Sequence, residues 1–198
     1  MRFLTKALIA AAALSAPALA NAAPLTVVNV AAPAINCVFN TSCTITVNDS
    51  IGNFTLPGDS GTGLLQSRTF DGAAGAPAAG KFGYDYRIVM TGMHAATAAN
   101  CIGTLKVNFG APLTFAYKPG VPSQVFVVTV GGLGAMGPTS ASISGSVVTF
   151  NFATPVCPGQ TSYFFGLAAN NDAADGPAQM IPTPGAVPVT VDGRAPHP

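Results

Sequence analysis

The sequence predicts an all-β protein: a single antiparallel β-sandwich, immunoglobulin-like or jelly-roll, stapled by disulfides and preceded by a cleaved signal peptide. Three observations support this. β-Branched residues and turn formers are abundant, good helix formers for exposed positions are scarce, and every acidic residue is Asp. Short runs with strand periodicity recur between clusters of Gly, Pro, Asn and Asp. Four cysteines, an even number, favour disulfides in an exported chain.

Residues 1–22 have the three parts of a secretory signal peptide. Two basic residues precede an apolar run over residues 7–14, and small residues follow as far as Ala22. The run is shorter than the roughly 20 apolar residues of a membrane helix. We therefore expect cleavage after Ala22, with cleavage after Ala20 as the alternative.

The remaining chain suggests one exported domain. We expect the β-sandwich over residues 23–192 and a disordered Pro-rich tail over residues 193–198. No later run suits a membrane helix, and there is no C-terminal apolar anchor sequence. After cleavage, six basic residues face seven acidic ones, so no basic surface is expected for nucleic acid or anionic lipid. We expect a secreted, extracellular or cell-surface protein, with the periplasm as an alternative.

Each strand is predicted from alternation or from a short apolar run. In 81–90 the residues Phe82, Tyr84, Tyr86 and Ile88 share one face, which indicates core positions with phenol tips that find partners. The run 124–130 is apolar on both faces, so we expect it to be covered on both sides. The predicted strands are 25–30, 43–48, 63–70, 81–90, 102–109, 114–117, 124–130, 140–144, 146–152, 162–168 and 187–191.

The intervening segments are predicted from their turn residues. Residues 71–80 are nearly all Gly, Ala and Pro and indicate a surface loop that buries little. Residues 131–138 form a Gly-rich turn, and Gly145 marks a hairpin between 140–144 and 146–152. Residues 93–100 allow one helical turn or a loop.

The cysteines allow three disulfide connectivities. We favour the local pairing, Cys37 with Cys43 and Cys101 with Cys157. A metal site is the competing interpretation, but no C-x-x-C pair occurs, and neither histidine has a matching spacing.

The sequence offers little for catalysis, and we expect no enzyme. His94 is the one credible general base, since His197 lies in the expected tail, and no nucleophile motif accompanies it. Asp85 is the acidic residue that lies within a strand pattern, two residues from Arg87. We expect these two to form an exposed ion pair on one strand face.

One loop has the oxygen-bearing side chains that calcium prefers: Asn170, Asn171, Asp172 and Asp175. It lacks the spacing and the terminal acid of an EF-hand, and an Asx-rich turn explains the same residues. We expect no cofactor and keep calcium as the alternative. The chain has no Trp, so nothing points to the flat aromatic surface of a sugar site.

The strings at 63–70, 81–87, 125–134 and 162–167 resemble, in the same order, secreted bacterial proteins of unknown function over most of the mature length. The resemblance implies no activity. Some such proteins have a C-terminal sorting tail, which this chain lacks, so retention at a cell surface is left open.

We therefore expect a non-enzymatic extracellular or cell-surface protein with a structural or interaction role, either matrix-like or adhesin-like. Self-association through a sheet edge, with residues 25–30 or the C-terminal strand as donor, is the expected route of assembly, alongside contact with other surface proteins. The alternative is a module that binds a ligand or glycan, assisted by calcium.

Overall fold

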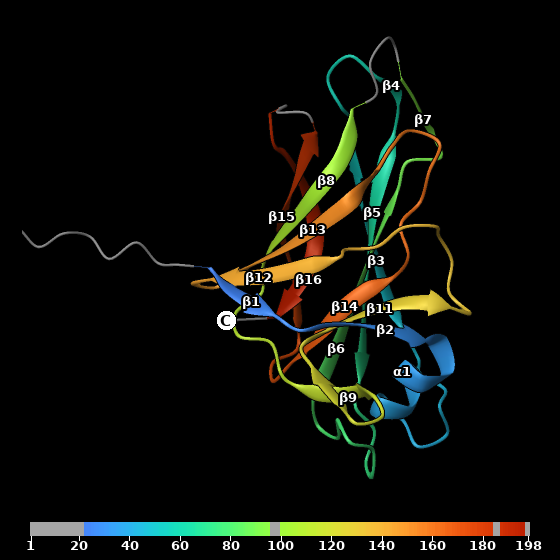
Figure 1. Cartoon of the computed structure of the whole chain (residues 1–198), viewed down its shortest axis with the longest axis vertical. Helices are drawn as coiled ribbons and strands as arrows, with labels where there is room; N and C mark the ends of the chain where they lie inside the picture. Colours follow the sequence, from blue (N-terminus) through green and yellow to red (C-terminus); the bar gives the residue numbers. More distant parts are fainter. Residues whose placement is uncertain (1–21, 96–99, 184–186, 197–198) are drawn as a thin grey trace, which may run out of the picture.

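A computed structural model describes residues 22–95, 100–183 and 187–196. Figure 1 shows a molecule built mostly of strands, with α1 and β9 at one end and β4 and β7 at the other. Two six-stranded sheets contain most of the strands. The all-β prediction is therefore confirmed for the described residues, apart from one short helix.

The first sheet has the strand order β1-β12-β13-β8-β15-β16, and each neighbouring pair is antiparallel. Its order mixes early and late segments, so most of its pairings join residues far apart in sequence. The bounds are β1 Ala23–Leu25, β8 Cys101–Asn108, β12 Ser140–Ser144, β13 Val147–Val156, β15 Ala173–Thr183 and β16 Val189–Pro196.

The second sheet has the order β2-β11-β14-β6-β5-β3. β2 pairs with β11 in parallel, and the other pairs are antiparallel. The prediction of a wholly antiparallel fold is therefore wrong at this pair. The bounds are β2 Val27–Ala31, β3 Asn48–Phe54, β5 Gly63–Asp71, β6 Phe82–Val89, β11 Val125–Val130 and β14 Phe165–Ala169.

Two short strand pairs and the helix complete the fold. β9 pairs with β10, and β4 pairs with β7. The bounds are α1 Ala32–Phe39, β4 Ser60–Gly61, β7 Met93–His94, β9 Phe115–Lys118 and β10 Val121–Ser123.

The main hydrophobic core takes side chains from both six-stranded sheets. Tyr84 and Tyr86 of β6 meet residues such as Leu105 of β8 and Phe150 of β13. Both tyrosines are fully buried, and their hydroxyls donate hydrogen bonds to the backbone oxygens of Asn171 and Arg194, 2.6 Å away in each case. The predicted core role of this strand, with phenol tips that find partners, is confirmed.

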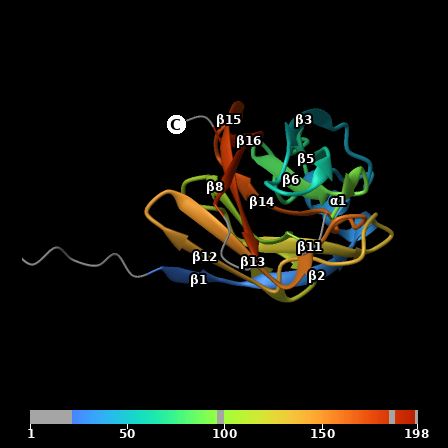
Figure 2. The same cartoon turned by 90° about the horizontal axis from the view of Figure 1, so that it is seen from above.

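A second, smaller core lies on the other face of the second sheet. Phe126 and Val128 of β11 belong to it, together with Phe39 of α1 and Tyr117 of β9, whereas Val125 and Val127 belong to the main core. β11 is therefore covered on both faces, as its continuous apolar run predicts. Figure 2 shows α1 beside the second sheet, away from β12 and β1.

The first predicted strand, residues 25–30, is divided between the two sheets. β1 pairs with β12, and after Thr26 the chain continues as β2 beside β11. This one short run thus provides an edge strand to each sheet. Both of its halves already pair with strands of the same chain.

The helix α1 and its surroundings differ from prediction. Residues 43–48 are mostly irregular, and the strand β3 begins at Asn48. Pro33 lies in the first turn of α1, where its fixed φ and missing N–H are tolerated. Ile35, Val38 and Phe39 are its buried residues, at the i, i+3, i+4 spacing of one helix face. The eight-residue length makes this pattern easy to miss.

The predicted surface loop 71–80 docks on the end of α1. Ala76 and Ala78 are buried, and the N–H groups of Ala73 and Ala78 donate to the backbone oxygens of Phe39 and Val38. These bonds satisfy carbonyls that a helix end leaves without intrahelical partners. Because the loop residues are small, the loop packs closely against the helix end. The prediction that this loop buries little is therefore wrong.

The C-terminal region is more regular than predicted. β15 lies inside the first sheet although it contains Pro177 and Pro182, and the register shifts between Ile181 and Pro182. An irregularity of this kind accommodates a residue without an N–H donor. β16 extends to Pro196, so residues 193–196 of the expected disordered tail form a strand.

Some predictions fall outside the described residues. They are the signal peptide as far as residue 21, part of the 93–100 segment, and His197. Within the described part of the chain, no helix is both long enough and apolar enough to cross a membrane.

Candidate functional site

The four cysteines form the disulfides Cys37–Cys43 and Cys101–Cys157, the local pairing that the sequence favours. The second joins the beginning of β8 to the residue after β13, and these strands are neighbours in the first sheet. It therefore closes the end of an existing ladder, where Ile102 already pairs with Val156.

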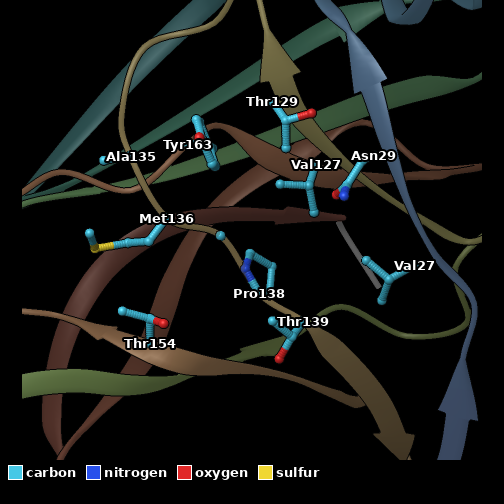
Figure 3. Close-up of a pocket in the computed structure, with 11 residues that line it drawn as sticks. Val27, Asn29, Val127, Thr129, Ala135, Met136, Pro138, Thr139, Thr154 and Tyr163 are labelled. Atoms are coloured by element: carbon cyan, nitrogen blue, oxygen red, sulfur yellow. The ribbon is translucent and has the colours of Figure 1, made fainter.

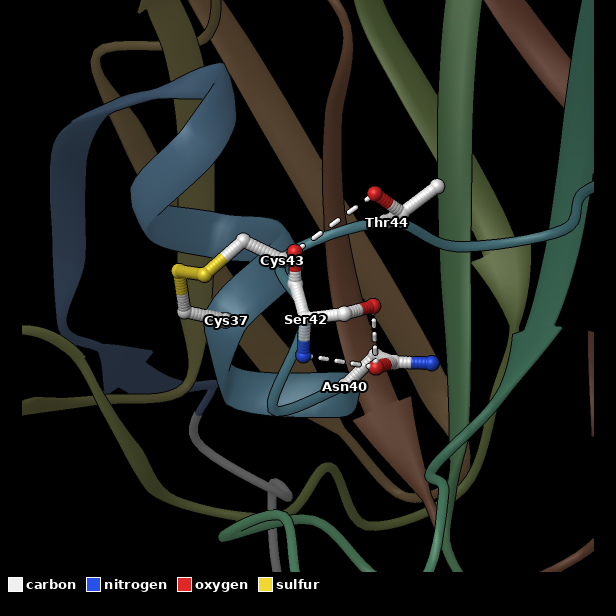
Figure 4. The surroundings of a disulfide bond; sticks show 5 residues. All are labelled: Cys37, Asn40, Ser42, Cys43 and Thr44. Atoms are coloured by element: carbon white, nitrogen blue, oxygen red, sulfur yellow. Dashed lines mark hydrogen bonds between the residues drawn. A yellow bond between two sulfur atoms is a disulfide. The ribbon is translucent and has the colours of Figure 1, made fainter.

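The first disulfide ties the last turn of α1 to the loop that follows. Cys43 has a positive φ of 57°, which is uncommon for a residue other than glycine. Figure 4 shows the Asn40 side chain turned toward Ser42, whose N–H and Oγ–H donate to Asn40 Oδ1 at 2.9 and 2.8 Å. The covalent bond and this Asx turn together fix the exit of the helix.

Three oxygens of the candidate calcium loop accept hydrogen bonds from other groups. Asn170 Oδ1 accepts a hydrogen bond from Lys81 Nζ at 2.7 Å, and Asp172 Oδ1 accepts one from the N–H of Ala173 at 2.6 Å. Asp175 lies beyond the turn, within β15. Asn171 accepts the Tyr84 hydroxyl at its backbone oxygen. The interpretation as an Asx-rich turn accounts for these contacts, and no group of three metal-binding acids, histidines or cysteines occurs in the described residues.

His94, the candidate base, lies exposed in β7 opposite Ser60 of β4. Its side chain makes no hydrogen bond within residues 22–95, 100–183 and 187–196.

Asp85 and Arg87 do not form the expected ion pair. Arg68 instead bonds Asp49 across β5 and β3, with Nε 2.6 Å from Oδ1. Arg68 and Arg87 both lie over the ring of Phe164, at 4.4 and 5.4 Å from its centroid. The prediction fails because α1 and the segment after β11 cover part of this sheet face, which the sequence pattern alone presents as solvent-exposed.

The environment of Asp85 changes its acidity. Its Oδ1 is enclosed and has no hydrogen-bond partner. Burial raises the pKa of Asp85 to about 7, the positive charge of Arg68 opposes this, and Asp49 adds to it. Burial, together with the nearby Arg68, lowers the pKa of Arg87. Asp85 is thus a partly buried carboxyl, with one enclosed oxygen and a pKa near neutral pH.

A second candidate site is a hollow of about 460 Å³, hereafter the inter-sheet pocket. Figure 3 shows its lining residues as sticks, with Asn29 and Thr129 on one side and Thr139 and Thr154 on the other. The residues come from β2, β11, β13 and the irregular segments between strands. They are Val27, Asn29, Val127, Thr129, Ala135, Met136, Gly137, Pro138, Thr139, Thr154 and Tyr163.

One wall of the inter-sheet pocket is held by a close backbone approach. Gly134 has a φ of 109°, and a Cβ there would collide with the backbone oxygen of Ser162. The N–H of Tyr163 donates to the backbone oxygen of Met136 at 2.7 Å. These contacts place the 134–139 segment beside Tyr163.

The inter-sheet pocket is uncharged, with both polar and apolar side chains in its lining. None of its eleven lining residues is charged. Thr139 Oγ1 donates to the backbone oxygen of Asn151 at 3.4 Å. The side chains of Asn29, Thr129, Thr154 and Tyr163 have no hydrogen-bond partner among the described residues. The pocket therefore presents an amide, hydroxyls and one aromatic ring that are free to bind a ligand. The sequence pattern does not predict it because its residues lie on five separate segments.

Comparison with known proteins gives no functional assignment: no protein-family model matches the chain, and a search of curated proteins finds no significant match.

Proposed function

We propose that this chain is a non-enzymatic extracellular or cell-surface interaction protein, adhesin-like, which binds a neutral, hydroxyl-rich ligand such as a glycan in the inter-sheet pocket. In this proposal, the two six-stranded sheets form one disulfide-stapled β-sandwich that holds the pocket rigid. The bacterial, secreted character expected from the sequence belongs to the same proposal.

The uncharged lining of the inter-sheet pocket, with its amide and hydroxyl groups, carries the proposal. Its volume of about 460 Å³ lies within the range of small-molecule sites. Side-chain amides and hydroxyls form hydrogen bonds with sugar hydroxyls, and an aromatic ring packs on apolar sugar faces. A charged ligand would find no opposite charge in the lining, so a neutral ligand fits best.

The two disulfides support a location outside the reducing cytoplasm. The low formal charge of the chain agrees with a partner recognised by hydrogen bonds and shape rather than by an electrostatic field.

The test is an NMR titration of the folded protein with cellobiose, lactose, maltose and chitobiose, each to about 10 mM, a range that detects millimolar affinity. At least one sugar is expected to shift the amide signals of Asn29, Thr129 and Tyr163. Glucuronate, which carries a negative charge, is expected to bind more weakly.

Asn29→Ala and Tyr163→Ala are expected to weaken binding at least about tenfold, since each removes a group that contacts the ligand. Asn53→Ala, an exposed Asn on β3, is the matched control and should leave binding unchanged. The proposal is wrong if none of the four sugars shifts these signals, or if both pocket variants bind as the parent does.

A further inference from the structure

Three charged side chains stand in one row across the outer face of the second sheet. Arg68 of β5 is the cross-strand neighbour of Asp49 on β3 and of Asp85 on β6. Side chains that stand directly opposite each other on neighbouring strands have Cβ atoms about 5 Å apart. Arg68 therefore lies between two carboxyl groups, and its guanidinium group can reach either of them.

In the structure, Arg68 is bonded to Asp49. Its Nε donates to Asp49 Oδ1 at 2.6 Å, and its Nη2 donates to Oδ2 at 3.4 Å. The side chains of Arg68 and Asp49 are 27% and 40% exposed. An ion pair that is exposed in this way contributes little to stability, because water competes for both charges. Arg68 can therefore leave Asp49 at a small cost in free energy.

A hollow of about 360 Å³ between α1 and the second sheet gives Arg68 room to turn toward Asp85. Arg68 and Asp85 both line it, as does Phe164, and the Arg68 guanidinium lies 4.4 Å from the centroid of that ring. The other lining residues are Ala32, Ile35, Asn36, Ile45, Val47, Val128, Gly131, Gly132 and Leu133. The guanidinium group and Asp85 thus face one open space.

The surroundings of Asp85 make an ionised carboxyl a strong competitor for Arg68. Asp85 Oδ1 is enclosed without a hydrogen bond among the described residues, and its neighbour on β14 is Gly166, which has no side chain. A partly buried carboxylate without a donor is costly, and its attraction to a cation is stronger than at the exposed Asp49, because the local dielectric constant is lower. A protonated Asp85 has no charge and does not compete.

The other groups that face Asp85 are less suitable partners. The lining residues from α1 and from residues 45–47 and 131–133 have no titratable side chain. Arg87 lies two residues along the same strand, about 7 Å away along the backbone, and its Nε is enclosed. The phenol of Tyr117 on β9 is also enclosed, and it supplies no positive charge. The charged and titratable groups around Asp85 are thus Arg68, Asp49, Arg87 and Tyr117.

We propose that Arg68 is a pH-dependent switch, which bonds Asp49 while Asp85 is protonated and turns to Asp85 when that carboxyl ionises. Burial raises the pKa of Asp85 to about 7, so the change falls near neutral pH. On the acidic side, Arg68 and Asp49 tie the edge strand β3 to β5. On the alkaline side, β3 presents the negative charge of Asp49, which Arg68 otherwise neutralises, at the surface of the molecule.

The first test is an NMR titration of the isotope-labelled protein between about pH 5 and about pH 9, a range that brackets the ionisation of Asp85. It follows the Nε–Hε signals of Arg68 and Arg87 and the carboxyl carbon of Asp85. The Arg68 and Asp85 signals are expected to titrate with one shared midpoint near 7. A fixed Arg68 signal, an Asp85 signal that does not titrate, or movement of Arg87 in place of Arg68 would overturn the proposal.

Asp85→Asn tests whether this carboxyl drives the switch. The amide keeps the shape of the side chain but cannot ionise, so the Arg68 signal should stay constant over the whole pH range. Asp192→Asn, the same change at an exposed position on β16, is the matched control and should titrate as the parent does. Melting curves verify that both variants are folded. An Arg68 signal that still moves through about pH 7 in Asp85→Asn would contradict the proposal.

Asp49→Asn gives a second readout that does not depend on a change in the buried region, because Asp49 lies at the surface. This variant removes the competing carboxylate, so Arg68 should stay with Asp85 and lower its titration midpoint by about one pH unit. Tyr117→Phe removes only an enclosed hydroxyl and should leave the Arg68 response in place. An unchanged Asp85 midpoint in Asp49→Asn, or loss of the Arg68 response in Tyr117→Phe, would show that Arg68 does not exchange between the two carboxyl groups.

Discussion

At the scale of single residues, the strand β6 shows what alternation predicts and what it leaves open. Period 2 identifies Tyr84, Tyr86 and Ile88 as core residues, because a buried face must be continuously apolar. It says nothing about the opposite face, where Asp85 and Arg87 could meet solvent or a second layer. The partial burial of Asp85 depends on α1 and residues 131–133, which are distant in sequence.

The raised pKa of Asp85 predicts a loss of stability as pH rises. The folded-state pKa of about 7 exceeds the ordinary value of 3.8, so the folded protein binds this proton more tightly than the unfolded chain. The stabilisation is complete below about pH 4 and is lost as pH rises to about 7. At 1.36 kcal/mol per pKa unit, the free energy of unfolding should fall by at most about 4 kcal/mol across this window.

Urea denaturation of the parent and of Asp85→Asn at several pH values measures this effect. The variant should lack the decline, and above about pH 7 it should be the more stable protein, because it has no buried carboxylate. Asp192→Asn should decline as the parent does. Parallel pH profiles for the parent and Asp85→Asn would show that this carboxyl is solvated.

At the scale of elements, strands with a full alternating or apolar pattern are predictable, whereas elements built on small or polar residues are not. β5, β6, β8 and β11 lie where the sequence places them. The sequence pattern does not predict β15 because its prolines disfavour a strand, nor β3 because Asn48, Asp49 and Asn53 are turn formers. Both become strands because neighbouring strands pair with them, which local propensity does not encode.

The candidate sites likewise include one that the sequence predicts and others that it does not. The cysteine pairing could be anticipated from order along the chain. The inter-sheet pocket could not, because it collects residues from segments that only strand order brings together. Asp85 did give a signal, as the acidic residue within a strand pattern.

The two disulfides should differ in their contribution to stability, because they close loops of different length. Cys101–Cys157 has a sequence separation of 56, and Cys37–Cys43 one of 6. In the chain-entropy model, loops of these lengths contribute about 4 and about 2 kcal/mol. Replacing each pair by alanine and measuring urea unfolding should reproduce this order. A larger loss from the shorter loop would indicate that its bond mainly holds α1 in place.

At the scale of the whole molecule, the edge strands at the two ends of the sheets are protected in different ways. On one flank β16 packs on β3, and the N–H of Arg194 donates to Ser67 Oγ at 3.0 Å. On the other flank, Pro24 of β1 has no N–H, and the N–H of Thr26 donates to Gln124 Oε1 at 2.8 Å. These features oppose addition of another strand at the segment where self-association was expected.

We therefore expect a monomer in solution, and a variant that associates when the β1 edge is opened. Pro24→Val combined with Gln124→Ala restores backbone donors along β1 and should raise the association constant at least about tenfold in sedimentation experiments. Gln179→Ala, an exposed Gln on a central strand, should leave it unchanged. Dimers of the parent protein would instead favour self-association through a sheet edge.

The division of residues 23–31 between the sheets also sets an order of events during folding. β2 pairs with β11 and β1 pairs with β12, so the first segment to emerge must wait for residues 125–144 before either ladder can form. Such distant pairings form slowly. For a chain synthesised from its N-terminus, both ladders are therefore completed only after residue 144 has been added.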